Sequence, residues 1–394
     1  MTTNPRAETE QYRKSIWEKE ATYNTTAQWL QDLQTEHSQL PEQDPVVITL
    51  ADIQTRVSKM KSWTAPGPDK ILTYWLKKLT ALHERRAAQM NQLLTSGDHP
   101  EWLTQGRTVL IMKEPQKGSV PSNYRPITCL STTWKLLSGL IAAKISRHVD
   151  QYMSRAQKGI GNNTRGVKHQ LLVDRAIAQD YRKRHTDLCT AWIDYKKAYD
   201  SMPHTWILEC LKLYNTNMTL REFIQNSKLW NTTLEANSKP IARRILERMT
   251  PHVTTLLYDG LNPLSQIITY RYQFRSGTTV SHLLYMDDIK LYAKNERDID
   301  SLIHLTRIYS KDIWMSFGLD KYERMISRRG KVITTDGVEL PEGNIADLQD
   351  SYKYLGIPQA NGNHEEAARR PATAKYCIKR RSLLWVQFLY LKHT

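Results

Sequence analysis

Two adjacent aspartates between two apolar runs constrain this chain more than any other feature of its sequence. Asp287 and Asp288 end the segment 285–288, and apolar and polar residues alternate in the flanking runs 280–284 and 289–293. Alternation with a period of two predicts a β-hairpin whose turn carries both carboxylates. Adjacent like charges repel unless a cation lies between them, and Mg²⁺ is usually held by one or two carboxylates together with substrate phosphates. Neighbouring aspartates also occur in ordinary turns, so this pair alone does not decide the function.

A third acid strengthens the prediction of a metal site. Residues 190–194 have the pattern of a buried strand that ends on Asp194, and the polar segment 195–204 follows it. Two strands could therefore bring three carboxylates to one point. Phosphoryl transfer to a 3′-hydroxyl by two metal ions about 4 Å apart needs that arrangement.

At these two segments the chain resembles a known family. Residues 285–288 resemble the YxDD signature of reverse transcriptases, and residues 194–204 resemble the D-x-x-K-A-[FY]-D-S-x-x-H block of non-LTR (LINE-like) retrotransposon polymerases. The likeness covers roughly residues 10–370 and is closest to site-specific elements whose single protein reverse-transcribes at a nicked genomic target. It implies an α+β, right-hand polymerase fold with fingers and palm and with the thumb largely missing. It also implies two Mg²⁺ ions, an RNA template, a DNA primer and dNTPs.

The resemblance assigns catalytic roles residue by residue. Asp194, Asp287 and Asp288 would be the catalytic metal ligands, with Asp288 the weaker member. Tyr199 would lie under the nucleotide sugar and exclude a 2′-hydroxyl, although a buried core tyrosine is the alternative. Lys321 would protonate the leaving pyrophosphate, although surface lysines are abundant.

The resemblance also places two basic residues in the fingers. Lys113 ends the apolar strand 108–113, and Arg125 follows a polar loop. Both would approach the incoming triphosphate and the template, which suits their charge and the donor fork of arginine. As isolated basic residues, they would be solvated surface. Residues 352–357 resemble the primer-grip strand, and residues 332–340, which contain an Asp-Gly pair, predict a further hairpin.

The apolar periodicity and the proline- and glycine-rich turns divide the chain into regions. We expect a helical lead-in over 1–60, a fingers-like region over 61–185, a palm-like region with the catalytic carboxylates over 186–358 and an aberrant tail over 359–394. Apolar residues at helical spacing predict helices within residues 11–36, 49–60, 71–79, 134–145, 170–182 and 299–313.

Composition favours a polyanionic partner. The chain has 394 residues, and its 56 basic against 40 acidic side chains give a formal charge of +16, which attracts nucleic acid. The 4 cysteines show neither CxxC nor Cys/His spacing, so we expect no disulfide and no zinc site. There is no apolar run of membrane length and no signal-peptide core at the start. We therefore expect an intracellular protein of the nucleus or cytoplasm that is not secreted and has no membrane partner.

The resemblance fails in one internal block. Between Asp194 and Asp287 the family carries G-x-x-Q-G-D-x-L-S-P, whereas this chain has the unrelated residues 243–259. Codons for residues 253–255 read one base later would encode Ser-Pro-Leu, so we hypothesise compensating frameshifts or a mis-predicted exon. A divergent loop is the alternative.

The chain also departs from the family at its end, because residues 377–394 break the pattern and no thumb, zinc knuckle, endonuclease or N-terminal DNA-binding module is recognised. These losses predict a fragment with impaired or lost polymerase activity. The alternatives are a non-catalytic, basic nucleic-acid-binding remnant and a relic without a selected role. Sequence does not indicate the oligomeric state.

Overall fold

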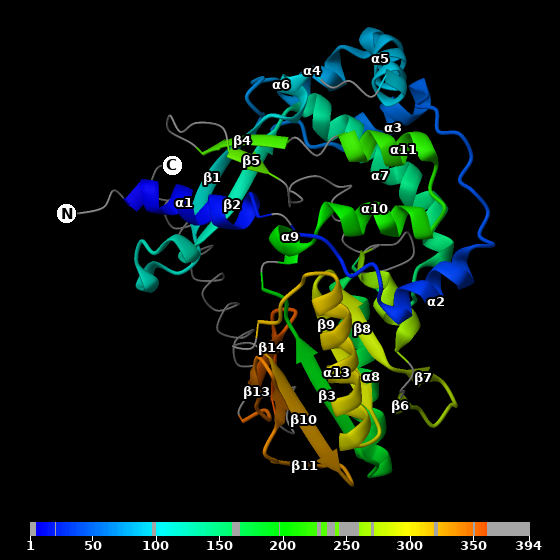
Figure 1. The fold of residues 1–394 in the computed structure, drawn as a ribbon, viewed down its shortest axis with the longest axis vertical. Coiled ribbons are helices and arrows are strands. Elements are labelled where there is room, and N and C mark those ends of the chain that lie inside the picture. Colours follow the sequence, from blue (N-terminus) through cyan, green and yellow to red (C-terminus); the bar gives the residue numbers. More distant parts are fainter. Residues whose placement is uncertain are drawn as a thin grey trace, which may run out of the picture. The chain divides into compact units, whose positions relative to one another are not determined.

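The computed structural model forms two compact units, each described by itself. Unit 1 combines Met1–Asn162, Tyr195–Ile267 and Arg307–Ser316, and unit 2 combines Asn163–Asp194, Ile268–Thr306 and Phe317–Thr394. Both units contain helices and strands, which confirms the α+β class (Figure 1). The described residues are 5–19, 21–96, 100–159, 166–196, 198–226, 230–234, 241–243, 260–268, 272–318, 322–349 and 351–360.

Unit 1 is mainly helical and carries one mixed sheet. The sheet has the strand order β2-β1-β4-β5, in which β1 and β2 are antiparallel and β1 and β4 are parallel. Within its described residues, the predicted lead-in over 1–60 contains three helices, because the helical stretch predicted within residues 11–36 forms two helices, α1 and α2, and α3 follows them. The elements of unit 1 are α1 (Pro5–Trp17), α2 (Gln28–His37), α3 (Leu50–Lys59), α4 (Thr73–Lys78), α5 (His83–Ser96), α6 (Glu101–Thr104), β1 (Gly106–Met112), β2 (Tyr124–Leu130), α7 (Thr132–Val149), α9 (Ala198–Ser201), α10 (His204–Leu213), α11 (Met218–Asn226), β4 (Trp230–Leu234), β5 (Ile241–Arg243) and a helix over 260–267.

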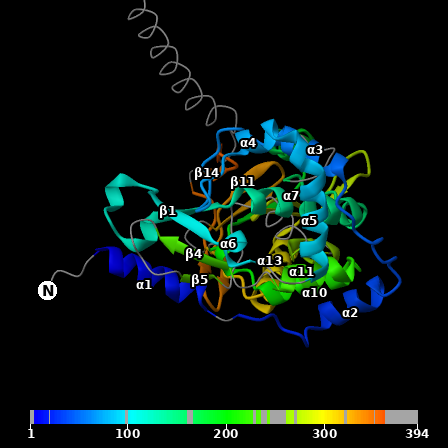
Figure 2. The ribbon, with the colours of Figure 1, turned by 90° about the horizontal axis from the view of Figure 1, so that it is seen from above.

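Helix α7 forms the centre of unit 1, as its apolar spacing predicts. Trp134, Leu137, Ile141 and Ile145 are all buried, and α3 packs against α7 while α10 packs against α11 (Figure 2). At Gly139 of α7 an added Cβ would lie 2.3 Å from the guanidinium of Arg56 on α3. The absence of a side chain at this position therefore leaves room for the Arg56 guanidinium against α7.

The proline- and glycine-rich turn at residues 64–70 packs onto the start of α7. A Cβ on Gly67 would lie 2.5 Å from the backbone of Leu130 and Ser131, so only glycine fits there. Asp69 accepts a hydrogen bond from the backbone of Thr132 at 3.2 Å, which ties the turn to the first residue of α7. This turn is therefore a packed part of the unit rather than an open loop.

Unit 2 is built on a five-stranded sheet with the order β11-β10-β3-β9-β8. The pairs β10–β3, β3–β9, β9–β8 and β10–β11 are all antiparallel. The elements of unit 2 are α8 (Val167–Arg184), β3 (Leu188–Ile193), β6 (Tyr272–Gln273), β7 (Thr279–Val280), β8 (His282–Tyr285), β9 (Asp288–Ala293), the first part of α13 (Glu296–Asp312), β10 (Glu323–Arg328), β11 (Lys331–Ile333), β12 (Val338–Leu340), β13 (Gly343–Ile345), β14 (Ser351–Tyr354) and β15 (Ile357–Ala360).

The central strand β3 is buried along its whole length, because both faces of the sheet are covered. On one face, Ile177 and Tyr181 of α8 pack with Leu188 of β3. On the other face, Arg324 of β10 pairs with Asp300 of α13. The sheet is therefore the middle layer between α8 and α13 within unit 2.

The predicted hairpin over residues 332–340 is wrong. Strand β11 turns back onto β10 through Arg329 and Gly330, whose φ values are +50° and +76°, as a two-residue hairpin turn requires. Strand β12 pairs instead with β13. At Gly337 a Cβ would lie 2.2 Å from the carbonyl oxygen of Ile345, so glycine serves close backbone packing there and not a hairpin between β11 and β12.

The predicted single strand over residues 352–357 is also corrected. It contains a tight turn at Leu355 and Gly356, with φ values of +48° and +83°, and this turn separates β14 from β15. The two strands form a two-stranded hairpin in which Tyr352 pairs with Gln359. Among the described helices, none is long and apolar enough to cross a membrane.

Candidate active site

The hairpin of β8 and β9 carries the aspartate pair, as predicted. Tyr285 pairs with Asp288, which leaves Met286 and Asp287 as the two turn residues. Met286 has a φ of +59°, in the left-handed region that glycine favours. A left-handed residue with a side chain costs about 1–2 kcal/mol, and such strain often occurs at functional sites. The turn holds Asp287 beyond the last residue pair of the two strands.

The third acid lies on the neighbouring strand. Ile193, the last residue of β3, pairs with Ile289 of β9, so continuing the antiparallel register brings Asp194 beside Asp288. Side chains alternate along a strand, so both carboxylates face the side of the sheet that carries Trp192. Asp194, Asp287 and Asp288 are each partly exposed. The structure therefore brings two predicted ligands together and places the third on the adjoining turn.

Tyr352 of the β14–β15 hairpin lies next to these carboxylates. Its ring stacks on Trp192, with 5.1 Å between centroids and 25° between planes. Burial raises the pKa of Tyr352, and the negative charges of Asp194 and Asp288 raise it further. The phenol therefore keeps its proton at neutral pH and can act as a hydrogen-bond donor beside the acidic pair.

A buried polar cluster lies two residues further along the same face of the sheet. The Lys290 ammonium donates to Asp174 of α8 at 2.5 Å and to the Gln359 side-chain oxygen at 2.8 Å. The Trp192 indole also donates to the Gln359 oxygen, at 3.0 Å, and the Gln359 amide donates to Asp174. Tyr292 donates to Asp174 at 2.7 Å. Burial alone would raise the pKa of Asp174, but the Lys290 charge and these hydrogen bonds outweigh it and lower the pKa.

The carboxylates fit a hard divalent cation by their donor chemistry. Asp194 and Asp288 supply oxygen ligands from adjacent strands, and both carboxylates are close enough to Tyr352 to raise its pKa. Carboxylate oxygens together with substrate phosphates are the usual environment of Mg²⁺. Within the described residues, no three His, Cys, Asp or Glu side chains are grouped so that they could hold an ion by themselves. The three-ligand set remains a prediction.

The predicted basic residues lie on the β1–β2 hairpin of unit 1. Arg125 pairs with Ile111, and Lys113 follows Met112 at the end of β1, where its backbone bonds to Asn123. Lys113 and Arg125 therefore lie on one face of this two-stranded ribbon. The Lys113 ammonium donates to the carbonyl of Ser122 at 3.0 Å. Their contact with nucleotide stays a prediction.

Tyr199 and Lys321 are the two remaining predicted site residues. Tyr199 lies in the short helix α9 of unit 1. Lys321 lies outside the described residues, as do residues 244–259 of the replaced block and the tail from residue 361. The roles given to these segments stay predictions.

Sequence reasoning missed Asp174, Lys290, Tyr352 and Gln359 as neighbours of the site. One signal was available for Lys290, which interrupts an apolar run in a strand expected to be buried. Another was available for Asp174, since it shares a helical face with the apolar Ile177 and Tyr181 and is buried with them. For Gln359 no local signal exists, because its partners lie far away in the sequence.

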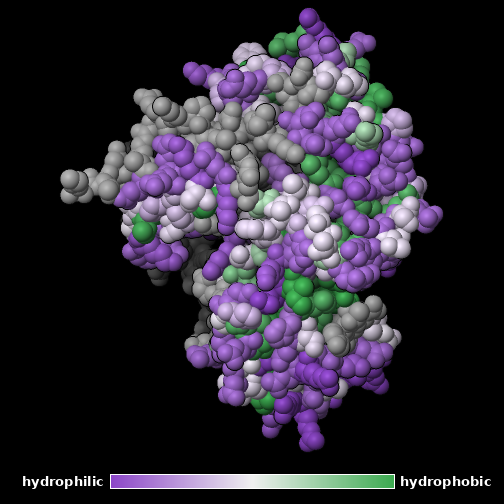
Figure 3. Space-filling view, in the orientation of Figure 1, coloured by the Kyte–Doolittle hydropathy of each residue, from purple (hydrophilic) through white to green (hydrophobic). Residues whose placement is uncertain are grey.

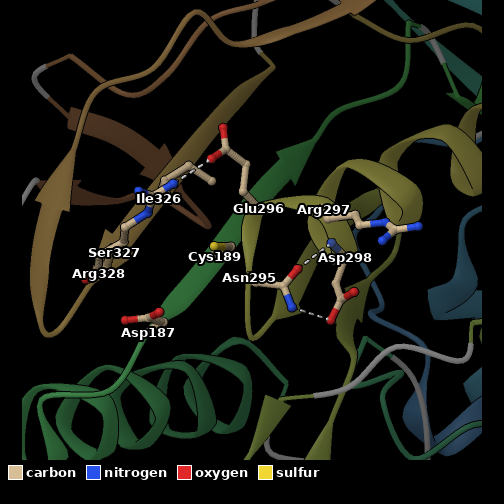
Figure 4. A pocket seen from close by; sticks show the side chains of 9 residues that line it. All are labelled: Asp187, Cys189, Asn295, Glu296, Arg297, Asp298, Ile326, Ser327 and Arg328. Carbon is tan, nitrogen blue, oxygen red and sulfur yellow. Dashed lines mark hydrogen bonds and ion pairs between the residues drawn. The ribbon is translucent and has the colours of Figure 1, made fainter.

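A cavity in unit 2 is separate from the carboxylates. It has a volume of about 590 Å³ and is lined by Cys189 near the start of β3, by Glu296 and Asp298 at the start of α13, and by Arg328 at the end of β10 (Figure 4). Five residues of extended strand separate Cys189 from Asp194, a span of about 16 Å. Burial raises the pKa of the Cys189 thiol to about 12, so the thiol stays protonated.

The comparisons with known proteins agree with this geometry. Residues 111–359 match the family described as Reverse transcriptase (RNA-dependent DNA polymerase). The chain is 22% identical over 316 residues to the Retrovirus-related Pol polyprotein from type-2 retrotransposable element R2DM of Drosophila melanogaster, covering 77% of this chain and 29% of that protein. It is 24% identical over 318 residues to the Retrovirus-related Pol polyprotein from type-1 retrotransposable element R2 of Nasonia vitripennis (75% and 29%).

A third relative is also named as a polyprotein of an R2 retrotransposable element. The chain is 30% identical over 319 residues to the Retrovirus-related Pol polyprotein from type-1 retrotransposable element R2 of Popillia japonica, covering 75% of this chain and 43% of that protein. The chain thus spans less than half the length of the relatives it matches. These matches confirm the predicted likeness to non-LTR retrotransposon reverse transcriptases. With the family match extending over most of its length and across all three aspartates, the chain belongs to the reverse transcriptase (RNA-dependent DNA polymerase) family.

Proposed function

We propose that this chain is the polymerase part of an R2-like retrotransposon protein and extends a DNA primer along an RNA template. The observation that carries the proposal is the placement of Asp194 beside Asp288, with Asp287 on the adjoining strained turn. Enzymes of this family use divalent metal ions, and we propose two Mg²⁺ ions at these carboxylates. Bound there, the ions would activate the primer hydroxyl and neutralise the triphosphate.

The chain's own residues suggest how the reaction is organised. The primer 3′-hydroxyl would give up its proton to solvent as its oxygen forms a bond to the α-phosphorus of the dNTP, and the bond from that phosphorus to the pyrophosphate oxygen would break. Asp194, Asp287 and Asp288 would hold the divalent ions and so keep the reacting groups in line, which contributes chiefly by positioning. Tyr352 would donate a hydrogen bond at the edge of this site. Lys113 and Arg125 would bind phosphate oxygens, Tyr199 would exclude a 2′-hydroxyl, and Lys321 would protonate the leaving group.

The proposed organisation follows the right-hand plan. We propose that residues 61–185 act as fingers and residues 186–358 as palm, after the lead-in 1–60 and before the tail 359–394. The proposed partners are an RNA template, a DNA primer and dNTPs, and no membrane. We place this activity inside the cell, in the nucleus or the cytoplasm, because its substrates are found there.

A second candidate function rests on charge and on the replaced block. The formal charge of +16 favours nucleic-acid binding whether or not catalysis survives. Residues 243–259 stand where the family carries the block that positions nucleotide and template. The chain would then be a basic remnant that binds nucleic acid without extending a primer.

Primer extension separates the two functions. The purified chain, its Asp287→Ala variant and an Asp44→Ala control would be assayed with an RNA template, a DNA primer, dNTPs and Mg²⁺. Asp44 is exposed in unit 1 and is no candidate ligand, so its variant should match the parent. We expect incorporation by the parent and the control, and none by Asp287→Ala.

Equal background from all three proteins would reject polymerase activity and favour the binding remnant. Incorporation by Asp287→Ala at the parent's rate would show that the reaction uses another site.

A further inference from the structure

The β14–β15 hairpin touches the carboxylate face of the sheet through one polar side chain and one ring. Gln359 is 4% exposed and receives hydrogen bonds from Trp192 and Lys290 at 3.0 and 2.8 Å. Its own amide donates to Asp174. The amide oxygen of Gln359 is therefore bonded to β3 and β9, and its amide nitrogen is bonded to α8.

Gln359 and Tyr352 lie opposite each other in the hairpin and share one neighbour. The two residues are directly paired across the hairpin, so they share one register position. Trp192 contacts both of them, because its indole donates to Gln359 and its ring stacks on Tyr352. A shift of Gln359 would therefore move the phenol of Tyr352 relative to Asp194, two residues after Trp192, and Asp288.

Lys290 and Asp174 form the buried ion pair to which Gln359 is bonded. Lys290 is 3% exposed and Asp174 is 7% exposed, and the Lys290 ammonium also lies 4.6 Å from the Trp192 ring and 5.3 Å from the Tyr354 ring. Gln170 of α8 donates to the Tyr354 hydroxyl at 2.8 Å, which gives the hairpin a second polar link to the same helix. A buried ion pair held by several hydrogen bonds favours a single geometry, because displacing either partner would leave a buried charge unpaired.

We propose that Lys290, Asp174 and Gln359 form a positioning unit that fixes the β14–β15 hairpin, and with it Tyr352, relative to Asp194 and Asp288. The unit touches no substrate. Its consequence for catalysis rests on the proposed polymerase function, whereas the fixing of the hairpin does not. Its members come from α8, β9 and β15, which are distant in sequence and adjacent only in the folded unit.

Gln359→Met is the sharpest test, because it keeps the length of the side chain and leaves the Lys290–Asp174 pair intact. Hydrogen exchange of the full chain would be followed in peptides that cover residues 351–360, β3 and β9. We expect exchange in 351–360 to become at least about tenfold faster while β3 and β9 change less than about twofold. Arg184→Met is the matched control, since it removes an ion pair of 3.0 Å with Asp180 from the same helix without touching the hairpin.

A second variant protects the test against simple misfolding. Lys290→Met combined with Asp174→Leu removes both buried charges together, so no uncompensated charge remains. We expect the same local increase of exchange in 351–360. When this pair is combined with Gln359→Met, the fold increase in exchange should be smaller than the product of the two separate fold increases. Unchanged exchange in 351–360, or an equal increase across β3, β9 and the hairpin, would overturn the proposal.

The effect on catalysis is measured by primer extension, separately from the effect on the hairpin. In primer extension by folded protein, Gln359→Met should lower kcat at least about tenfold and change the KM for dNTP less than about twofold, because geometry rather than ground-state binding is lost. An unchanged kcat with a loosened hairpin would overturn the positioning role. If the parent itself lacks Asp287-dependent incorporation, the polymerase function fails, and hydrogen exchange still decides whether the unit fixes the hairpin.

Discussion

His282 on β8 is the residue through which pH should act most clearly on unit 2. It is buried three positions before Tyr285, and its ring nitrogen Nδ1 lies 2.8 Å from the Ser281 hydroxyl. Burial lowers its pKa from 6.5 to about 4. Between these values the unfolded chain takes up a proton at this histidine and the folded chain does not. The contribution of His282 to the unfolding free energy is therefore fully present above pH 6.5 and is lost as pH falls toward 4.

We predict that His282→Asn flattens this pH dependence. The shift corresponds to roughly 3 kcal/mol of unfolding free energy lost across the window, and the variant should lack most of that slope. Urea unfolding at several pH values between neutral and acidic would measure it. His304→Asn is the control, because His304 is exposed on α13. Parallel slopes for parent and His282→Asn would show that His282 takes no part.

At the scale of elements, one arginine holds a loop and a helix to the sheet. Arg324 of β10 is 0% exposed, and it donates to Asp347 at 2.8 Å and to Asp300 of α13 at 2.6 Å. It also donates to Glu296 at 3.4 Å and to Thr335, whose backbone bonds to Asp347. These contacts connect residues 335–347, a segment that contains β12 and β13, to the face of the sheet that α13 covers.

We predict that Arg324→Met destabilises unit 2 by about 3–5 kcal/mol, since it leaves carboxylates without their buried partner. Arg324→Lys should recover little, because lysine lacks the planar fork that reaches several acceptors at once. Arg328→Met is the matched control, as Arg328 bonds the same Glu296 at 3.2 Å but is 62% exposed. It should change stability by less than about 1 kcal/mol in urea unfolding. Equal losses for both variants would contradict the assignment.

The other elements of unit 2 show how strand order forms the site. Strand β3 lies between β9 and β10, so the acid that follows it is beside the aspartate that begins β9. The β14–β15 hairpin then adds Tyr352 on the same face. Each contribution comes from a different part of the chain.

At the scale of the whole molecule, charge is the dominant property. The formal charge is +16, and hydrophilic residues dominate the coloured surface on the face seen in Figure 3. Basic proteins bind nucleic acid by releasing counterions from the phosphates. Binding of that kind can persist even where catalysis is impaired.

We predict saturable RNA binding that weakens steeply with salt. If about five phosphates are neutralised, the logarithm of the binding constant should fall with the logarithm of salt concentration at a slope near −3.5. Fluorescence anisotropy with a labelled RNA at several salt concentrations would measure it, and Asp287→Ala, which keeps the positive charges, is the control. Binding that does not saturate, or that ignores salt, would indicate aggregation of a relic chain instead.

Local pattern determined the elements that carry the site. The alternation over residues 280–293 predicted the β8–β9 hairpin, and the apolar run before Asp194 predicted β3. The spacing of Trp134, Leu137 and Ile141 predicted α7. These predictions succeed because periods of two and 3.6 depend only on neighbouring residues. The hairpin predicted over 332–340 was wrong. The turn at Arg329 and Gly330 pairs β11 with β10, and the hydrogen bond from Arg324 to Asp347 fixes the segment that follows β11.

By itself, the sequence determined the family and the hairpin that presents Asp287 and Asp288, because each depends on a short, local pattern. Only the tertiary structure decided that Asp194 lies beside Asp288 and that Tyr352 lies next to both. It also brought Lys290, Asp174 and Gln359 together two residues further along the same face of the sheet. Lys290 and Asp174 are 116 residues apart, and Gln359 and Asp174 are 185 apart. A buried charge is stable only where folding supplies its partners, and partners so distant in sequence leave no local signal.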